Sequence, residues 1–498
     1  MDQAREVIAR ARRAQLDWAQ VTPAERAMRM LAMRDRIVQQ ADHLAEVISA
    51  DTGKTRIDAL ATEVIPAALA TAYYARRSPR LLRPRRLRHS SILFANKRST
   101  LHRLPWGVVG VISPWNYPLG IPMHEIVPAL LAGNAVIFKT APETLNVGRA
   151  IAELMAVPEL PPDLFALIEL DGPVAGDLFL SPEGVDKLFF TGSVAVGKIL
   201  MEKAAQTLTP VSLELGGNDP MLVCPDAPLQ RAVNGALWAG LQNSGQTCAG
   251  VERIYVHREI YQAFMALLKQ AVEGLRVGPD RDHDVDIGAM CTTRQASKVR
   301  EQIADAIARG ARVHAQSALA PDLDQSRYLA PLVLADVDHQ MIIMREETFG
   351  PVLCVMAVDD MEQAVALAND SMLALTASVW SRDRRGAQAL ARRLHAGTLT
   401  INDHLISHGL AETPWGGFKE SGLGRSHGEL GLEEMTAPQV VVDERLPFLR
   451  RNVFWHPYDA ALYQGLRGML DAVAGRGLGR RLGGAIRFAR LLPRVWRD

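Results

Sequence analysis

The stretch Lys187-Leu-Phe-Phe-Thr-Gly-Ser-Val-Ala-Val-Gly197 decides the fold, because an apolar run passes through a glycine-bearing turn into a helical pattern. The first residues predict a buried strand. Gly192, Ser193 and Gly197 then suit a pyrophosphate held at a helix N-terminus. The turn lacks the GxGxxG spacing of the dinucleotide fingerprint, so an ordinary strand-to-helix connection explains it equally well.

Similar apolar runs lie on both sides of this stretch, at Gly107–Ser113, Ala135–Lys139, Leu164–Leu170 and Pro210–Leu215. The segments between them have the length of helical crossovers, which connect parallel strands. This alternation predicts a parallel sheet covered by helices on both faces. In such a sheet, ligands bind at the carboxyl ends of the strands.

A second α/β rhythm follows between Pro220 and Leu405, with apolar runs at Met221–Cys224, Ile254–Val256, Pro351–Ala357, Thr376–Trp380 and Thr398–Asn402. Long helical stretches separate these runs as well. The sequence therefore predicts an α/β protein with two successive regions of alternating strands and helices.

Residues 1–76 predict helices, with a break at Asp51-Thr-Gly-Lys-Thr55. A phosphate-binding P-loop would need glycine at position 48, where the chain has Ile48. The break is better explained as a helix that ends at Gly53. The arginine-rich residues 76–88 indicate a solvated or salt-bridged face.

The composition is that of a globular protein, with 498 residues, 48% hydrophobic and 22% charged, enough for two or three domains. A net charge of +1 shows no bias toward nucleic acid. The four cysteines are scattered and form no metal-binding motif, so we expect no metal site and a reducing, cytoplasmic location. The N-terminus does not resemble a signal peptide, and no apolar run has the length of a membrane span.

Candidate catalytic residues begin with Cys248, in the stretch Asn243-Ser-Gly-Gln-Thr-Cys248-Ala-Gly. A thiol is nucleophilic only as the thiolate, and the backbone amides of a glycine-bearing turn can stabilise a thiolate and then an oxyanion. Taken alone, Cys248 is more simply explained as a small buried residue.

Two further polar residues follow predicted strands. Asn116, in Pro114-Trp-Asn-Tyr-Pro118, could direct its amide at a substrate or simply shape a turn. Glu214 ends an apolar strand in Leu213-Glu-Leu-Gly-Gly217, where burial would raise its pKa and make it a general base. A structural glutamate with a charged partner is the alternative.

The ordered motifs PWNYP, FTGS, ELGG, GQTC, EETFGP and GGFKESG resemble those of the aldehyde dehydrogenase superfamily, from about residue 5 to residue 444. The spacings from Asn116 to Lys139 and from Glu214 to Cys248 also match that family. The resemblance implies that Cys248 attacks an aldehyde, that Asn116 and the Cys248 backbone N–H hold the oxyanion, and that Glu214 activates water to release a carboxylic acid. It also implies that NAD or NADP is the cofactor, with contacts at Trp115, Lys139, Gly192, Ser193, Glu347 and Phe349.

Some features depart from the family pattern. After Lys139 the chain reads Thr-Ala-Pro142-Glu143, which displaces by one position the carboxylate that favours NAD, so we expect both cofactors to be accepted. The segment after Asn116 lacks the arginine that succinate-semialdehyde oxidisers use. Met123 and His124 there suggest a more apolar tunnel, or core packing.

The sequence leaves two alternatives to the oxidation of an aldehyde to the acid. In a CoA-acylating aldehyde dehydrogenase, CoA takes the acyl group from the cysteine. Glu214 argues against this, because such relatives tend to lack the base. A non-catalytic, membrane-associated scaffold protein could keep the fold, but the intact Asn116, Glu214 and Cys248 argue against it.

The resemblance implies a Rossmann-like cofactor domain (residues 1–81 and 106–216), a second α/β domain that is catalytic (217–420) and a small bridging β element (82–105 and 421–444) that forms a homodimer or homotetramer. Residues 445–498 extend beyond it with eleven arginines, no lysine and three aspartates. Their apolar residues cluster on helical faces, which predicts packing on this or a neighbouring subunit, or peripheral contact with an anionic membrane.

Overall fold

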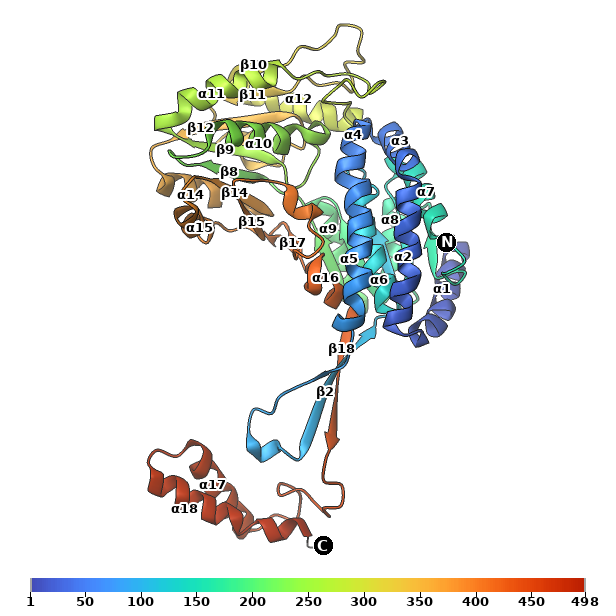
Figure 1. The fold of residues 1–498 in the computed structure, drawn as a ribbon, viewed down its shortest axis with the longest axis vertical. Helices are drawn as coiled ribbons and strands as arrows, with labels where there is room; N and C mark the ends of the chain where they lie inside the picture. Colours follow the sequence, from blue (N-terminus) through green and yellow to red (C-terminus); the bar gives the residue numbers. More distant parts are fainter. Residues whose placement is uncertain (1, 497–498) are drawn as a thin grey trace. The chain divides into compact units, whose positions relative to one another are not determined.

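The computed structural model describes residues 2–496 and begins with a run of helices (Figure 1): α1 (Asp2–Gln20), α2 (Pro23–Gln39), α3 (Ala41–Thr52), α4 (Arg56–Ala59) and α5 (Ile65–Leu81). Thr22 caps α2, because its hydroxyl accepts the backbone N–H of Glu25 at 3.2 Å. Gly53 ends α3 with φ 84°, so the predicted helix end is correct. A π-helical turn, Leu60–Val64, joins α4 to α5.

The first sheet has the strand order β17-β7-β6-β3-β4-β5, parallel except for β17. Every residue of its three central strands is buried, as expected when helices cover both faces. The strands are β3 (Val108–Ile112), β4 (Ala135–Lys139), β5 (Phe165–Leu167), β6 (Lys187–Thr191), β7 (Val211–Glu214) and β17 (Gly422–Leu423), and the connecting helices are α6 (Gly120–Ala132), α7 (Leu145–Met155), α8 (Gly172–Phe179) and α9 (Val194–Thr207).

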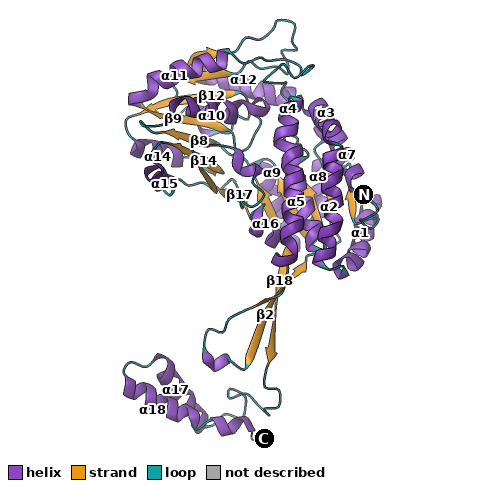
Figure 2. Cartoon of the chain, in the orientation of Figure 1, coloured by secondary structure: helices purple, strands orange, loops and turns teal. Residues whose placement is uncertain are grey.

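The second sheet has the order β10-β11-β12-β9-β8-β14-β15, parallel except for β10, and separate apolar clusters cover it. Its strands are β8 (Asp219–Val223), β9 (Val251–His257), β10 (Arg312–Gln316), β11 (Leu332–Ala335), β12 (Val352–Val358), β14 (Thr376–Trp380) and β15 (Thr398–Ile401). Its helices are α10 (Leu229–Leu241), α11 (Arg258–Glu273), α12 (Thr293–Ala308), α13 (Ile342–Arg345), α14 (Met361–Asn369) and α15 (Arg384–Ala391). Figure 2 shows the helices flanking the strands. The predicted α/β class is confirmed, with two largely parallel sheets.

The short strands β13 (Leu373–Ala374) and β16 (Phe418–Lys419) pair with each other, and helix α16 (Gly428–Glu434) follows them. By its internal contacts the chain divides into two units, residues 1–83 with 103–437 and residues 84–102 with 438–498. No described helix has the length and apolar character needed to cross a membrane.

The smaller unit contains a three-stranded sheet of β1 (Arg85–Arg86), β2 (Lys97–Pro105) and β18 (Thr436–Glu444), followed by helices α17 (Ala460–Ala474) and α18 (Leu478–Ala489). The two helices form a close hairpin in which a side chain on Gly468 would approach Gly484 O to 2.7 Å. Asp471 binds Arg480 at 2.9 Å and Arg487 at 2.6 Å across this hairpin. The glycines of the tail therefore allow close helix packing.

Candidate active site

Cys248 follows a tight turn that links α10 to β9. Asn243, Ser244 and Gly245 have positive φ angles of 54°, 56° and 71°. A side chain on Gly245 would come within 2.1 Å of the Gly350 carbonyl oxygen, so only glycine permits this approach. The turn thereby brings Cys248 close to the Glu346–Pro351 segment, which the sequence analysis assigned to cofactor binding.

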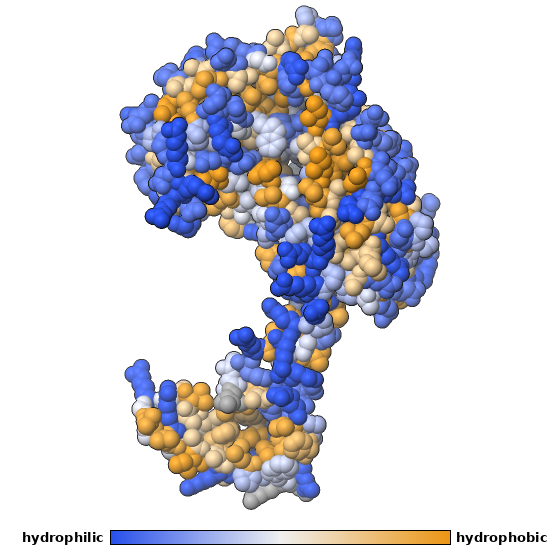
Figure 3. Space-filling view, in the orientation of Figure 1, coloured by the Kyte–Doolittle hydropathy of each residue, from blue (hydrophilic) through white to orange (hydrophobic). Residues whose placement is uncertain are grey.

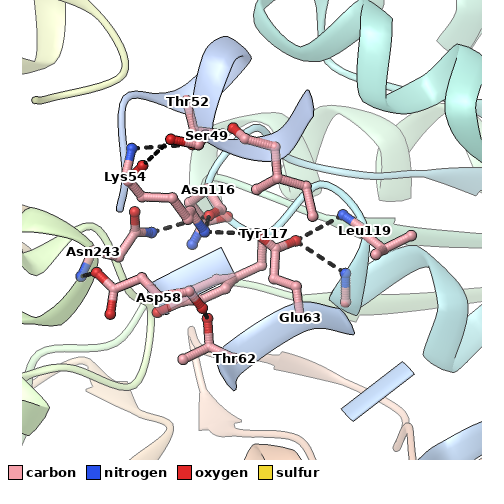
Figure 4. Close-up of polar contacts among 12 residues, drawn as sticks. Ser49, Thr52, Lys54, Asp58, Thr62, Glu63, Asn116, Tyr117, Leu119 and Asn243 are labelled. Atoms are coloured by element: carbon pink, nitrogen blue, oxygen red, sulfur yellow. Dashed lines mark hydrogen bonds and ion pairs between the residues drawn. The ribbon is translucent and has the colours of Figure 1, made fainter. Parts of the chain in front are cut away.

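A buried ion pair supports the loop that carries Asn116 (Figure 4). Lys54 Nζ lies 2.7 Å from Glu63 Oε1, and both side chains are fully buried. Lys54 also donates to the Asn116 carbonyl oxygen at 2.7 Å, and Glu63 accepts the backbone N–H groups of Leu119 at 2.8 Å and Gly120 at 3.1 Å. Since a buried pair is costly unless its remaining hydrogen bonds are made, these contacts fix the loop backbone.

The Asn116 side chain lies beside the cysteine loop. Its Nδ2 donates to the Gln246 carbonyl oxygen at 3.1 Å, and Asn243 Nδ2 in turn donates to the Asn116 carbonyl oxygen at 3.0 Å. A side-chain amide has two N–H donors, so one remains for a ligand. Asn116 is therefore a rigid donor held against the turn before Cys248.

Glu214 is at the carboxyl end of β7 and is 8% exposed. Its Oε2 has no hydrogen-bond partner among the described residues. Burial raises the Glu214 pKa well above its usual value, and the nearby Glu125 carboxylate raises it further. Burial also raises the pKa of Glu125 to about 8. The raised pKa makes the ionised Glu214 carboxylate a stronger proton acceptor than an exposed glutamate.

The Cys248 thiol lies among carboxylates that disfavour its ionisation. Burial raises its pKa far above the ordinary value, and the carboxylates of Glu347, Asp219 and Glu214 raise it further. Burial and these carboxylates raise the pKa of the thiol by more than the backbone amide of Cys248 lowers it. Ionisation needs a nearby proton acceptor or a positive charge.

A polar cavity of about 230 Å³ opens at Cys248. It brings together all the predicted site residues except Lys139, namely Trp115, Asn116, Gly192, Ser193, Glu214, Cys248, Glu347 and Phe349. Lys139 ends β4 and is 5% exposed, but it is not among the residues that line this cavity.

Several features of the polar cavity fit a dinucleotide. Ser193 caps α9, whose N-terminus suits a pyrophosphate. A side chain on Gly216 would come within 2.8 Å of the Glu347 carboxylate, so glycine leaves this acceptor accessible to ribose hydroxyls. The Phe349 ring meets Trp115 edge-on, with centroids 5.5 Å apart. The residues present therefore fit NAD or NADP.

The residues that hold the Glu346–Pro351 segment were not predicted from the sequence. Glu252 on β9 accepts the backbone N–H groups of Thr348 at 2.9 Å and Phe349 at 2.8 Å. Lys298 on α12 donates to the Glu347 carbonyl oxygen at 2.7 Å. The positions of Glu252 and Lys298 in the sequence match no motif that indicates this contact. A glutamate within an apolar strand such as β9 nevertheless suggests a buried hydrogen-bonding role.

An apolar cavity of about 290 Å³ also reaches Cys248. Apart from the ring of His408, its lining contains no basic side chain and no carboxylate: Ala61, Thr62, Pro66, Tyr117, Ile121, Trp238, Gln242, Thr247, Cys248, Ala249, Leu405, Ile406, His408, Gly409 and Trp415. The arginine that the segment after Asn116 lacks is therefore not supplied by another residue of this lining.

Comparisons with known proteins agree with this geometry. The model of the aldehyde dehydrogenase family matches residues 1–441. A 4,4'-diapolycopene aldehyde oxidase of Methylomonas sp. is 41% identical over 468 residues, 94% of this chain and 86% of that protein.

Solved structures are similar as well. A succinate-semialdehyde dehydrogenase from Burkholderia pseudomallei has a TM-score of 0.83 at 32% identity, covering 88% of this chain and 89% of that one. An aldehyde dehydrogenase from Bacillus cereus in complex with NAD+ has a TM-score of 0.83 at 30% identity, covering 88% of each chain.

Proposed function

This chain belongs to the aldehyde dehydrogenase family and oxidises aldehydes with NAD or NADP, and we propose that Cys248, Glu214 and Asn116 carry out the reaction. The observation that carries the proposal is the meeting of the two cavities at Cys248. One cavity fits a cofactor and the other fits a carbon chain, so the reacting atoms come together at the thiol.

In the proposed mechanism, the Cys248 sulfur adds to the aldehyde carbon and the thiol proton is transferred to a base. The Asn116 Nδ2–H and the Cys248 backbone N–H stabilise the resulting oxyanion. Loss of one such donor typically slows acyl-transfer enzymes by about 100-fold or more. A bound dinucleotide, held by Ser193, Glu347 and Phe349, would supply the hydride acceptor and a positively charged ring that favours the thiolate. Loss of hydride from the carbon leaves a thioester on Cys248.

Glu214 then removes a proton from water, and the water oxygen attacks the thioester carbon. The products are the carboxylic acid and the free thiol. Splitting the oxidation into a capture step and a hydrolysis step replaces one difficult barrier with two lower ones. The raised Glu214 pKa makes the ionised carboxylate a stronger base than an exposed glutamate.

The aldehyde is, in our proposal, apolar. A distal carboxylate, as in succinate semialdehyde, would enter the apolar cavity without an arginine or lysine to pair with it, and a buried unpaired charge is strongly unfavourable. The relative from Methylomonas is named for an apolar polyene aldehyde, which agrees with this lining.

A chain-length series tests this substrate class. Each buried methylene contributes about 0.8 kcal/mol, or about fourfold in kcat/KM, until the cavity is filled. We expect kcat/KM to rise along straight-chain aldehydes from propanal to octanal and to exceed that for succinic semialdehyde. Equal or better use of succinic semialdehyde would contradict the proposal.

We also propose a cytoplasmic homodimer or homotetramer that contacts membranes through its tail. β18 leaves Val440, Val441 and Val442 between 47% and 60% exposed, an apolar strand surface that suits a second subunit. All four cysteines are free, as in a reducing compartment.

The tail hairpin has the character of a membrane-binding surface. Figure 3 shows apolar side chains gathered on it, and Leu470, Leu478, Leu482, Ile486 and Trp496 are all more than half exposed. Arginines surround them, and an apolar face edged with cations suits an anionic bilayer. The Methylomonas match covers 94% of this chain and so extends past residue 441 into the tail.

Co-sedimentation with anionic vesicles at low salt tests this surface. We expect full-length protein to sediment with the vesicles and a variant truncated after residue 444 to stay in the supernatant. If both stay in solution and truncation instead lowers the oligomer mass, the tail packs against another subunit.

A further inference from the structure

Three histidines converge in a small hollow beside the catalytic residues. His124 comes from α6, His408 from the turn Ile406–Gly409, and His427 directly precedes α16. The ring centroids of His124 and His427 are 3.9 Å apart, and those of His408 and His427 are 4.9 Å apart. One ring nitrogen from each residue lies within 4.8 Å of the other two.

The ring nitrogens in this hollow lack protein partners. Neither nitrogen of His124 has a hydrogen bond within the described chain, although the residue is only 1% exposed. His427 is 2% exposed, and its Nε2 also has no such partner. Buried polar groups are nearly always satisfied, so these nitrogens need a ligand from outside the protein.

The backbone of His427 is held in a strained conformation. Its φ of 59° and ψ of 162° lie in a region that is essentially restricted to glycine. Its Nδ1 is 2.9 Å from the Ser426 hydroxyl, which leaves Nε2 as the free nitrogen. Metal-binding histidines commonly engage the other ring nitrogen in this way, because the contact fixes the tautomer and the ring orientation.

The size and charge of the hollow suit a single cation. Its volume is about 20 Å³, enough for one ion or water and too small for an organic group. Its lining also includes Glu125 and Glu214, whose carboxylates can balance a positive charge, and Cys248. Zinc bonds of about 2.0–2.1 Å place tetrahedral ligands roughly 3.4 Å apart, so modest ring movements would complete the site.

We propose that His124, His408 and His427 bind one divalent late-transition-metal ion, such as Zn²⁺, and that the bound ion stops aldehyde oxidation. Three imidazoles with an open fourth position form a donor set that zinc favours. The ion would lie in the hollow that Glu214 and Cys248 share, where it displaces the hydrolytic water and pairs with the carboxylate. The inhibitory part of the inference rests on the proposed roles of these two residues, whereas the binding part does not.

Binding is tested on the full-length Cys248→Ser variant, because removing the thiol excludes simple capture of metal by the nucleophile. After treatment with a chelator, the protein is titrated with Co²⁺ and with Zn²⁺. We expect one equivalent to bind, with the visible absorption of four- or five-coordinate cobalt. His124→Ala and His427→Ala should each weaken binding at least 100-fold, and His395→Ala, which alters an exposed histidine outside the cluster, should not.

A second measurement does not depend on how the histidine variants fold, because it uses the Cys248→Ser protein with all its histidines in place. Cu²⁺ bound to the Cys248→Ser protein should show hyperfine coupling to three imidazole nitrogens in its electron paramagnetic resonance spectrum. Fewer coupled nitrogens, no stoichiometric binding, or unchanged affinity in folded His124→Ala protein would overturn the site.

Inhibition is measured on the protein with Cys248 intact. NADH formation should fall with Zn²⁺ at the same half-saturation as binding and should return when EDTA is added. Stoichiometric Zn²⁺ binding without loss of activity would overturn the inhibitory role while leaving the metal site in place.

Discussion

The apolar cavity and the polar cavity both end at Cys248, but their walls have different chemistry. Tyr117, Ile121 and Trp238 line the apolar side, where no basic residue or carboxylate other than the His408 ring is present. Ser193 and Glu347 line the polar side, together with backbone that glycines leave open. Because the two walls differ in this way, we expect the hydride donor and the hydride acceptor to be recognised independently, with only the residues around the thiol shared.

The largest expected effect comes from the residue that both cavities share. Cys248→Ser should reduce kcat to below about one per cent of the original value, because loss of a nucleophile typically costs far more than that. Cofactor affinity, measured by quenching of protein fluorescence, should stay within about threefold. Turnover above one per cent, or a parallel loss of cofactor binding, would mean that the cavities are not separable in this way.

A matched pair of substitutions, one in each cavity, should give smaller effects, one on cofactor binding and the other on use of the aldehyde. Glu347→Gln should weaken cofactor affinity about tenfold, since it removes a carboxylate acceptor for the ribose hydroxyls, while the KM for octanal stays unchanged. Trp238→Ala should lower kcat/KM for octanal about tenfold by removing apolar surface, with the KM for cofactor unchanged. Trp238 is 43% exposed, so this substitution should cost little stability.

Steady-state kinetics with octanal and propanal separate the two variants. Propanal, which reaches less of the apolar wall, serves as the internal control for Trp238→Ala. If either substitution raises the KM for cofactor and for octanal by similar factors, the two cavities do not recognise their ligands independently.

Much of the fold was predictable because strand position follows from local hydrophobicity. The buried strands β4, β6 and β14 begin and end at residues that the apolar runs mark, and Gly53 ends a helix as its conformational freedom suggests. The gathering of Asn116, Glu214 and Cys248 at one cavity was predictable from the resemblance of their motifs to a known family, because each residue taken alone also had a simple structural explanation.

The supporting contacts could not be predicted, because they depend on distant residues. Lys54 pairs with Glu63, which lies in a π-helical turn that no local sequence pattern predicts, and together they position the loop of Asn116. Glu252 holds a segment that lies 96 residues away along the chain. The raised pKa of the Cys248 thiol likewise depends on burial and on carboxylates from other elements.

The most direct test of the account is capture of the thioester on Cys248. In a Glu214→Gln variant, hydrolysis should slow at least 100-fold, since a general base typically contributes that much. Hydride transfer should continue for one turnover. In the unmodified enzyme, hydrolysis should accelerate with rising pH as Glu214, whose pKa is raised, loses its proton, and in the variant this dependence should disappear.

Glu214→Gln protein is mixed with NAD and octanal, and both NADH and the intact protein mass are followed. We predict a burst of about one NADH per active site and a mass increase equal to one octanoyl group, which the additional substitution Cys248→Ser abolishes. Loss of the burst together with steady-state turnover, or an adduct that survives Cys248→Ser, would contradict the account.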